Sequence, residues 1–142
     1  MISVLMDPFL LRIYSIVIFL ASLYFQLMNL SLEVIELNYL INYKGFPKGL
    51  LANEVKISLN NTIKRCDTVL YSRDMSAKLI VEYKAPHIHI TQAVFDQITR
   101  YNMVLKVEYL IVTNGINHYC CKINYTDGSY SFINEIPSYD TL

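Results

Sequence analysis

Three β-strand patterns follow one another near the middle of the chain, and only short turns separate them. The segments are EVKISL (54–59), RCDTVLY (65–71) and LIVEYK (79–84). The first alternates between apolar and polar residues, whereas the third begins with consecutive apolar residues, as strands with partly or wholly buried faces do. Because short turns join antiparallel neighbours, we expect these strands to form an antiparallel meander.

A helix and further strands follow the meander. Pro86 ends the third strand, Thr91 can cap a helix, and apolar residues then repeat at helical spacing from Val94 to Leu105. EYLIVTNG (108–115) has the pattern of a buried strand that ends in an Asn-Gly turn, and HYCCKIN and YSFI are further strands on either side of the turn YTDGS. This order of elements predicts an α/β fold.

The composition is that of one globular domain. The chain has 142 residues, of which 54% are hydrophobic and 17% charged, so it can bury a substantial core. Twelve Lys and Arg residues balance twelve Asp and Glu residues. A net charge of zero argues against a basic protein that coats nucleic acid, although it leaves room for a local basic cleft.

The cysteines indicate neither a disulfide framework nor a zinc site. Cys66, Cys120 and Cys121 are odd in number, and the chain has no CxxC pair. If Cys120 and Cys121 lie in a strand, their side chains point to opposite faces. We therefore expect three reduced core residues in a cytosolic protein.

The N-terminal part of the chain is unusual because it carries no charge between Ile13 and Leu32, a run of 20 residues. Such a run is long enough to cross a bilayer. The Ser, Gln and Asn residues in the run argue against a membrane span, and the alternatives are a signal peptide and a buried or partner-facing helix of a soluble fold. We treat residues 1–32 as a hydrophobic N-terminal segment and residues 33–142 as a separate domain, with a helix expected to begin near Ser31.

Charged residues stand where the third strand should remain apolar. Side chains alternate along a strand, so Ile80, Glu82 and Lys84 share one face. If the second strand pairs with the third through their turn, Asp67 comes to lie near Glu82. Each strand is then apolar at one end and charged at the other, as at the rim of a core.

Two carboxylates held close together repel each other, and a divalent cation would resolve this conflict. Mg²⁺ needs only one or two protein carboxylates, and it acidifies bound water and neutralises phosphate charge. Lys84 could orient that water or stabilise developing negative charge. The alternative is an exposed ion pair of little consequence, which is the commoner situation for Glu-x-Lys in a strand.

An acid in one strand, a turn, and an apolar strand that ends in Glu-x-Lys together resemble the signature of the PD-(D/E)xK nuclease superfamily. Asp67, Glu82 and Lys84 match that signature. In the following helix, Gln97 and Tyr101 have the Gln-x-x-x-Tyr spacing of the branch that contains exonuclease V-type nucleases and type I restriction enzymes. Being one helical turn apart, they can face a common site.

From about Asn38 onward the chain resembles the family of type I restriction enzyme R-subunit N-terminal domains, most closely from CDTVLY through VTNG. The resemblance implies a restriction-endonuclease-like mixed sheet flanked by helices. It also implies endonuclease cleavage of DNA that depends on Mg²⁺, for which Mn²⁺ can substitute.

The resemblance implies specific roles at the metal site. Asp67 and Glu82 would be metal ligands and Lys84 the catalytic lysine. The backbone carbonyl of Tyr83 and the carboxylate of Glu54, an acid upstream of Asp67, would complete the metal shell.

The resemblance also implies roles in holding DNA. Gln97 and Tyr101 would position DNA or the lysine. Arg100, Lys64 and Arg65 could contact phosphates, although solvation at the surface accounts for them equally well.

The chain departs from the family in two respects. Its N-terminal residues are more hydrophobic than expected, as in a membrane anchor, a diverged capping helix or a frame-shifted stretch. It also has no GxxxxGK[ST] loop, so it would either act as a small independent nuclease or borrow a motor or specificity subunit from a partner. We expect a cytoplasmic location and, for double-strand cleavage, a homodimer on DNA. The alternative function is a non-catalytic DNA-binding or assembly module of a restriction or repair complex.

Overall fold

The computed structural model describes residues 8–142, except for the side chains at positions 8–11, 14, 29, 31, 59, 100 and 101. Its elements in chain order are α1 (Pro8–Lys44), the 3-10 helix η1 (Lys48–Leu50), β1 (Leu51–Leu59), β2 (Thr62–Tyr71), β3 (Ala77–Tyr83), α2 (Gln92–Leu105), β4 (Tyr109–Thr113), β5 (His118–Asn124), β6 (Ser129–Ile133) and the 3-10 helix η2 (Tyr139–Thr141).

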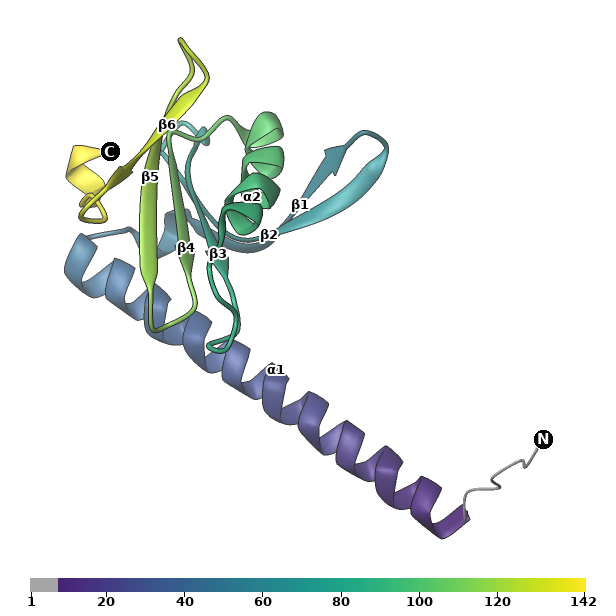
Figure 1. Cartoon of the computed structure of the whole chain (residues 1–142). Coiled ribbons are helices and arrows are strands. Elements are labelled where there is room, and N and C mark those ends of the chain that lie inside the picture. The colour runs from purple at the N-terminus through teal and green to yellow at the C-terminus, as the bar shows by residue number, and fades with distance from the viewer. Residues whose placement is uncertain (1–7) are drawn as a thin grey trace.

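The six strands form one sheet in which spatial order follows chain order, β1-β2-β3-β4-β5-β6 (Figure 1). β3 and β4 pair in parallel, and the other neighbours pair antiparallel. The parallel pair requires a crossover, which α2 supplies. The expected meander of the first three strands and the mixed α/β architecture are therefore confirmed.

The sheet is covered on both faces, with one core on the α2 side and one on the α1 side. Ile80 packs with Phe95 and Ile98 of α2, whereas Leu79 and Val81 pack with the other core, which includes Leu40 of α1. Consecutive apolar residues in β3 are thus explained, because alternate side chains enter different cores.

The cysteines follow the same alternation. Cys66, Cys120 and Cys121 are buried free thiols, as expected. Cys120 belongs to the α1-side core and Cys121 to the α2-side core. Burial raises the pKa of Cys121 to about 11 and those of Cys66 and Cys120 to about 12, so all three remain protonated at neutral pH.

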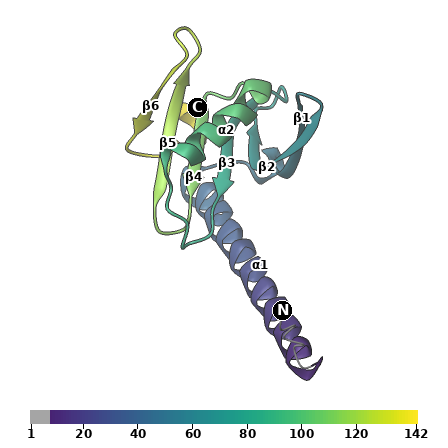
Figure 2. The ribbon, with the colours of Figure 1, turned by 45° about the vertical axis from the view of Figure 1, so that its right-hand side comes forward.

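α1 is one continuous helix, and the expectation that a helix begins near Ser31 is wrong. Between Phe9 and Lys44 the sequence contains no proline or glycine to interrupt the helix, which ends at Gly45 in the left-handed region with a φ of 72°. The boundary expected at residue 32 falls inside this helix. The first half of α1 projects away from the sheet, and the second half lies against it (Figures 1 and 2).

The docked half of α1 presents one face to the sheet. Its buried side chains, Leu32, Glu36 and Leu40, are spaced four residues apart. Leu32 packs against Gly115 in the β4–β5 turn, where an added Cβ would collide with the leucine side chain.

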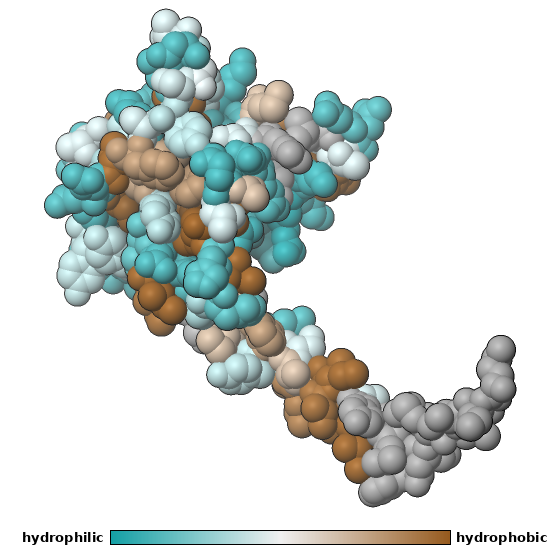
Figure 3. Space-filling view, viewed as in Figure 1, coloured by the Kyte–Doolittle hydropathy of each residue, from teal (hydrophilic) through white to brown (hydrophobic). Residues whose placement is uncertain are grey.

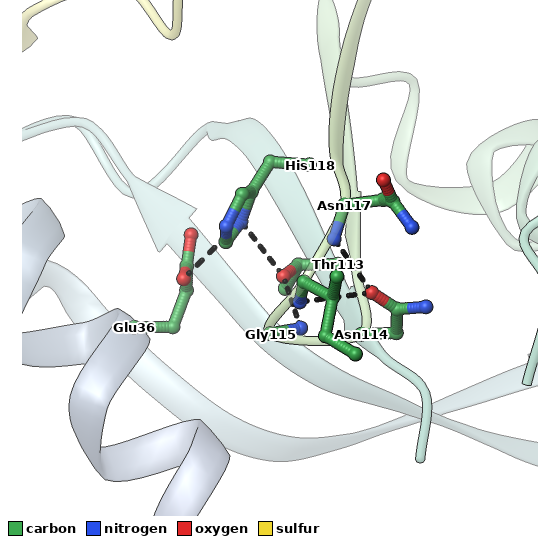
Figure 4. A network of polar contacts seen from close by, with 7 residues as sticks. Glu36, Thr113, Asn114, Gly115, Asn117 and His118 are labelled. Atoms are coloured by element: carbon green, nitrogen blue, oxygen red, sulfur yellow. Dashed lines mark hydrogen bonds and ion pairs between the residues drawn. The ribbon is translucent and has the colours of Figure 1, made fainter. Parts of the chain in front are cut away.

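A polar network beside this contact joins α1 to the β4–β5 turn (Figure 4). Glu36 Oε2 lies 3.6 Å from His118 Nδ1, which in turn lies 2.9 Å from Thr113 Oγ1. Within the turn, the Asn117 backbone N–H donates to Asn114 Oδ1 over 2.7 Å. The turn is thus held both by its own hydrogen bonds and by the helix.

We predict that Gly115→Ala destabilises the protein more than Gly128→Ala. Both glycines have positive φ, 80° and 72°, but only Gly115 has a neighbour, Leu32, within reach of an added Cβ. Positive φ costs a residue with a Cβ about 1–2 kcal/mol, and overpacking adds about 1–3 kcal/mol. Urea unfolding of both variants measures the difference, and equal losses would show that the Leu32 contact contributes nothing.

We predict that Glu36→Gln becomes increasingly stabilising, relative to wild type, as the pH rises from about 4 to 8. Burial raises the pKa of Glu36, and His118 opposes this shift. The carboxyl group therefore stabilises the fold below its unfolded-state pKa, and this contribution is lost as the pH rises through the raised folded-state pKa. The glutamine amide does not ionise, so the variant does not lose stability in this way as the pH rises.

The measurement is the free energy of unfolding of wild type and Glu36→Gln across this pH range. Glu135→Gln, which replaces an exposed carboxylate after β6, is the matched control. A Glu36→Gln difference that stays constant with pH would contradict the interpretation.

Candidate functional site

The antiparallel register of β2 and β3 sets Asp67 opposite Glu82. Thr68 pairs with Val81 and Val69 with Ile80, and this register continued by one residue sets Asp67 level with Glu82. Asp67 Oδ2 also accepts a hydrogen bond from the Tyr83 backbone N–H over 2.8 Å. The two acids that the alternation pattern predicted to be neighbours therefore lie side by side at this end of the strands.

Glu82 and Lys84 form a largely buried ion pair. Lys84 Nζ donates to Glu82 Oε1 over 2.8 Å, and the two side chains are 19% and 7% exposed, respectively. The exposed ion pair considered as the alternative is therefore not what the strand forms. Glu82 Oε2 is buried without a hydrogen-bond partner. An unsatisfied buried carboxylate oxygen is costly, and such an atom calls for an explanation.

Both carboxyl groups have raised pKa values, and the charge of Asp67 contributes to the shift of Glu82. Burial raises the pKa of Glu82, and the charge of Asp67 raises it further, against the lowering effect of Lys84. Burial likewise raises the pKa of Asp67, whereas the Tyr83 N–H and the charges of Lys84 and Arg65 lower it. A bound cation would favour the ionised form of both groups.

A second group of acidic residues lies on the other side of Asp67. Glu33 of α1 and Glu54 of β1 line a cavity of about 460 Å³ with Asp67 and Tyr83, together with Gln26, Leu30 and Arg65. Burial raises the pKa of Glu33 most, and the negative charges of Asp67 and Glu54 raise it further. The field of Asp67 therefore reaches both groups of acids.

Glu54 is an exposed member of this group. It has a φ of 54° within β1, and its carboxylate lies 3.0 Å from Arg65 Nη1. Both of these side chains are more than half exposed, so the pair contributes little to stability. Glu54, the upstream acid expected beside Asp67, thus lines the same cavity as Asp67. Arg65 forms an ion pair with Glu54.

Glu33 was not among the residues singled out from the sequence. The only local sequence feature that marked Glu33 was its position as the first charged residue after the uncharged residues 13–32. Its proximity to Asp67 depends on how α1 crosses the sheet, which no local pattern encodes.

Tyr83 supports the strand end beneath the acids. Its hydroxyl lies 3.2 Å from Thr68 Oγ1, which donates to Asn53 Oδ1 over 3.0 Å. Burial raises the pKa of Tyr83, so the phenol remains neutral. This chain of hydrogen bonds ties β1, β2 and β3 together where Asp67 binds the Tyr83 backbone.

The remaining predicted residues are exposed or lie outside the described side chains. Gln97 is exposed on α2, next to the buried Ile98, and Lys64 is exposed on β2. The side chains of Tyr101 and Arg100 lie outside the described set. Their predicted roles stay predictions.

The donor set suits a cation that needs few protein ligands. Within residues 8–142, no group of three or more His, Cys, Asp and Glu side chains is arranged to hold a metal ion. Asp67 and Glu82 could nevertheless hold one as a pair, since Mg²⁺ is usually bound through one or two carboxylates and retains several waters. The unpartnered Glu82 Oε2 fits this use.

Comparison with known proteins gives a family match and a structural match. The family described as type I restriction enzyme R protein N terminus (HSDR_N) matches residues 35–137. No curated protein matches the chain.

The structural match is to a fragment of a protein assigned as an HsdR subunit of a type I restriction enzyme from Vibrio vulnificus YJ016. The TM-score is 0.51 at 19% sequence identity, and the match covers 73% of this chain. It covers 22% of the Vibrio chain, so the present chain corresponds to a small part of that protein. At this identity the match shows a shared fold.

Proposed function

Because the chain belongs to the family of type I restriction enzyme R protein N termini, we propose that it is a metal-dependent DNA endonuclease of the PD-(D/E)xK type. The observation that carries this proposal is the buried Glu82 carboxylate, bonded to Lys84, opposite Asp67, and left with one unpartnered oxygen. These three groups at the end of a buried strand have no evident structural use. Replacing a buried ion pair with hydrophobic residues of similar volume often leaves a protein equally or more stable.

In the proposed site, Asp67 and Glu82 hold Mg²⁺ or Mn²⁺, with the Tyr83 carbonyl and Glu54 as further ligands. The metal, when bound, supplies Lewis-acid polarisation of the phosphate and lowers the pKa of a bound water. Tyr83 N–H fixes the Asp67 carboxylate, because the hydrogen bond to Oδ2 leaves Oδ1 for other partners.

Lys84 has two roles in this proposal. In the structure described it balances the Glu82 charge over 2.8 Å. During cleavage its ammonium group orients the attacking water or stabilises the negative charge that develops on the phosphate. Gln97 and Tyr101 position DNA or this lysine, and Lys64, Arg65 and Arg100 contact phosphates.

The family match also supports a wider setting for this proposal. A domain of a restriction enzyme subunit acts on DNA in the cytoplasm, and it works with a separate motor or specificity subunit. Double-strand cleavage by a single-site domain requires two copies, hence a homodimer on DNA.

We predict that Mg²⁺ raises the melting temperature of the wild-type protein and not that of Asp67→Asn or Glu82→Gln. A ligand that binds only the folded state stabilises it by about 2.7 kcal/mol at one hundred times its Kd. Thermal unfolding with MgCl₂ and with EDTA measures the shift, with Glu135→Gln as a matched carboxylate control. A shift of the same size in all four proteins would place any Mg²⁺ binding elsewhere.

We predict Mg²⁺-dependent nicking of supercoiled plasmid that falls by roughly 100-fold or more in Lys84→Ala and Asp67→Asn, as expected for loss of a group acting in the transition state. Lys78→Ala, near the other end of the same strand, is the matched lysine control and should cleave as wild type does.

Circular dichroism on each variant separates loss of activity from loss of fold. Cleavage that persists in both site variants would refute the proposal. DNA retention without cleavage by the wild-type protein, at any metal concentration, would identify the domain as a non-catalytic DNA-binding or assembly module instead.

A further inference from the structure

The free half of α1 exposes an apolar surface that the domain leaves uncovered. We call Ile13–Phe25 the free segment; it projects from the sheet in both views of the ribbon and carries a brown apolar surface (Figures 1, 2 and 3). Its described large apolar side chains are 42% to 67% exposed: Ile13, Ile16, Val17, Ile18, Phe19, Leu20, Leu23, Tyr24 and Phe25. Water is an unfavourable environment for a surface of this kind.

The exposed apolar residues surround the helix rather than forming a stripe. Residues 16–20 are five consecutive apolar residues, and successive side chains on a helix point about 100° apart. Together they therefore face every direction around the axis. α2 differs, because Phe95 and Ile98 are buried whereas Asp96 and Gln97 are exposed. A helix that is apolar all round belongs in a protein interior or in lipid.

A second copy of the chain would not satisfy this surface. Two helices packed side by side bury one seam each and require polar or charged residues outside it. The free segment has no charged residue to flank such a seam. Lipid hydrocarbon contacts all faces at once, and a helix satisfies its own backbone hydrogen bonds there.

Length and contacts limit how far the free segment can insert. At 1.5 Å per residue its 13 residues extend about 20 Å, compared with about 30 Å for the hydrocarbon core of a bilayer. At its end, the Phe25 ring meets His87 of the loop after β3, with ring centroids 5.3 Å apart. From Gln26 onward α1 lines the acidic cavity beside Asp67, so the domain itself sets the depth.

We propose that the free segment of α1 inserts into a lipid bilayer and holds the domain at the membrane surface. α1 between Ser15 and Lys44 is also long and apolar enough by composition to qualify as a membrane helix. A cleaved signal sequence is a poor account of it, because the same helix continues into Leu32, Glu36 and Leu40 of the folded core. This proposal is independent of the nuclease chemistry.

The test is flotation of the purified full-length chain with vesicles of phosphatidylcholine and phosphatidylglycerol at three to one. We expect the wild-type protein to float with the vesicles, also in 1 M NaCl, since apolar insertion is not screened by salt. Single lysines at three faces about 100° apart, Ile16→Lys, Val17→Lys and Ile18→Lys, should each reduce the floated fraction by about tenfold or more. Ile63→Lys, which replaces an isoleucine 75% exposed in β2, is the matched control and should float as wild type does.

A second readout uses the absence of tryptophan from the chain. Phe19→Trp should show a blue-shifted emission when vesicles are added, whereas Phe132→Trp, at an exposed position of β6, should not. The proposal is overturned if the wild-type chain stays with the soluble fraction, or if only one of the three lysine positions matters, as for a one-sided protein contact. It is also overturned if 1 M NaCl releases the protein.

Discussion

The burial of β3 on both of its faces is the constraint on which the rest of the structure depends. Leu79 and Val81 enter the core that contains Leu40 of α1, and Ile80 enters the core beneath α2. β3 also pairs with β2 along one edge and with β4 along the other, so it lies inside the sheet. Because β3 occupies the centre, Glu82 at its end is withdrawn from water while Lys84, two residues further, remains partly accessible.

The same arrangement explains why the candidate site is electrostatically strained. Asp67 and Glu82 face each other across β2 and β3, both with raised pKa values, and Glu82 keeps an unpartnered oxygen. A chain selected only for stability would replace these groups with apolar ones. Local conflict of this kind, inside an otherwise consistent fold, is where functional sites are expected.

α1 combines two physical environments in one helix. Its C-terminal half uses Leu32, Glu36 and Leu40 to close the sheet, and the family match begins at residue 35, within this half. None of the described side chains of the free segment before it is buried. The helix therefore links a domain that folds around its sheet to an apolar extension whose stability depends on what surrounds it.

Local patterns in the sequence determined the six strands, α2, the opposite facing of Cys120 and Cys121, and the pairing of Asp67 with Glu82. Each follows from side-chain alternation, helical spacing and short turns, which act between near neighbours in the chain. Only the tertiary structure decided that Glu33 joins the cavity beside Asp67 and that the Glu82–Lys84 pair is buried. These features depend on which surfaces meet across long separations in the chain, and the free energy of such contacts is not encoded in any one segment.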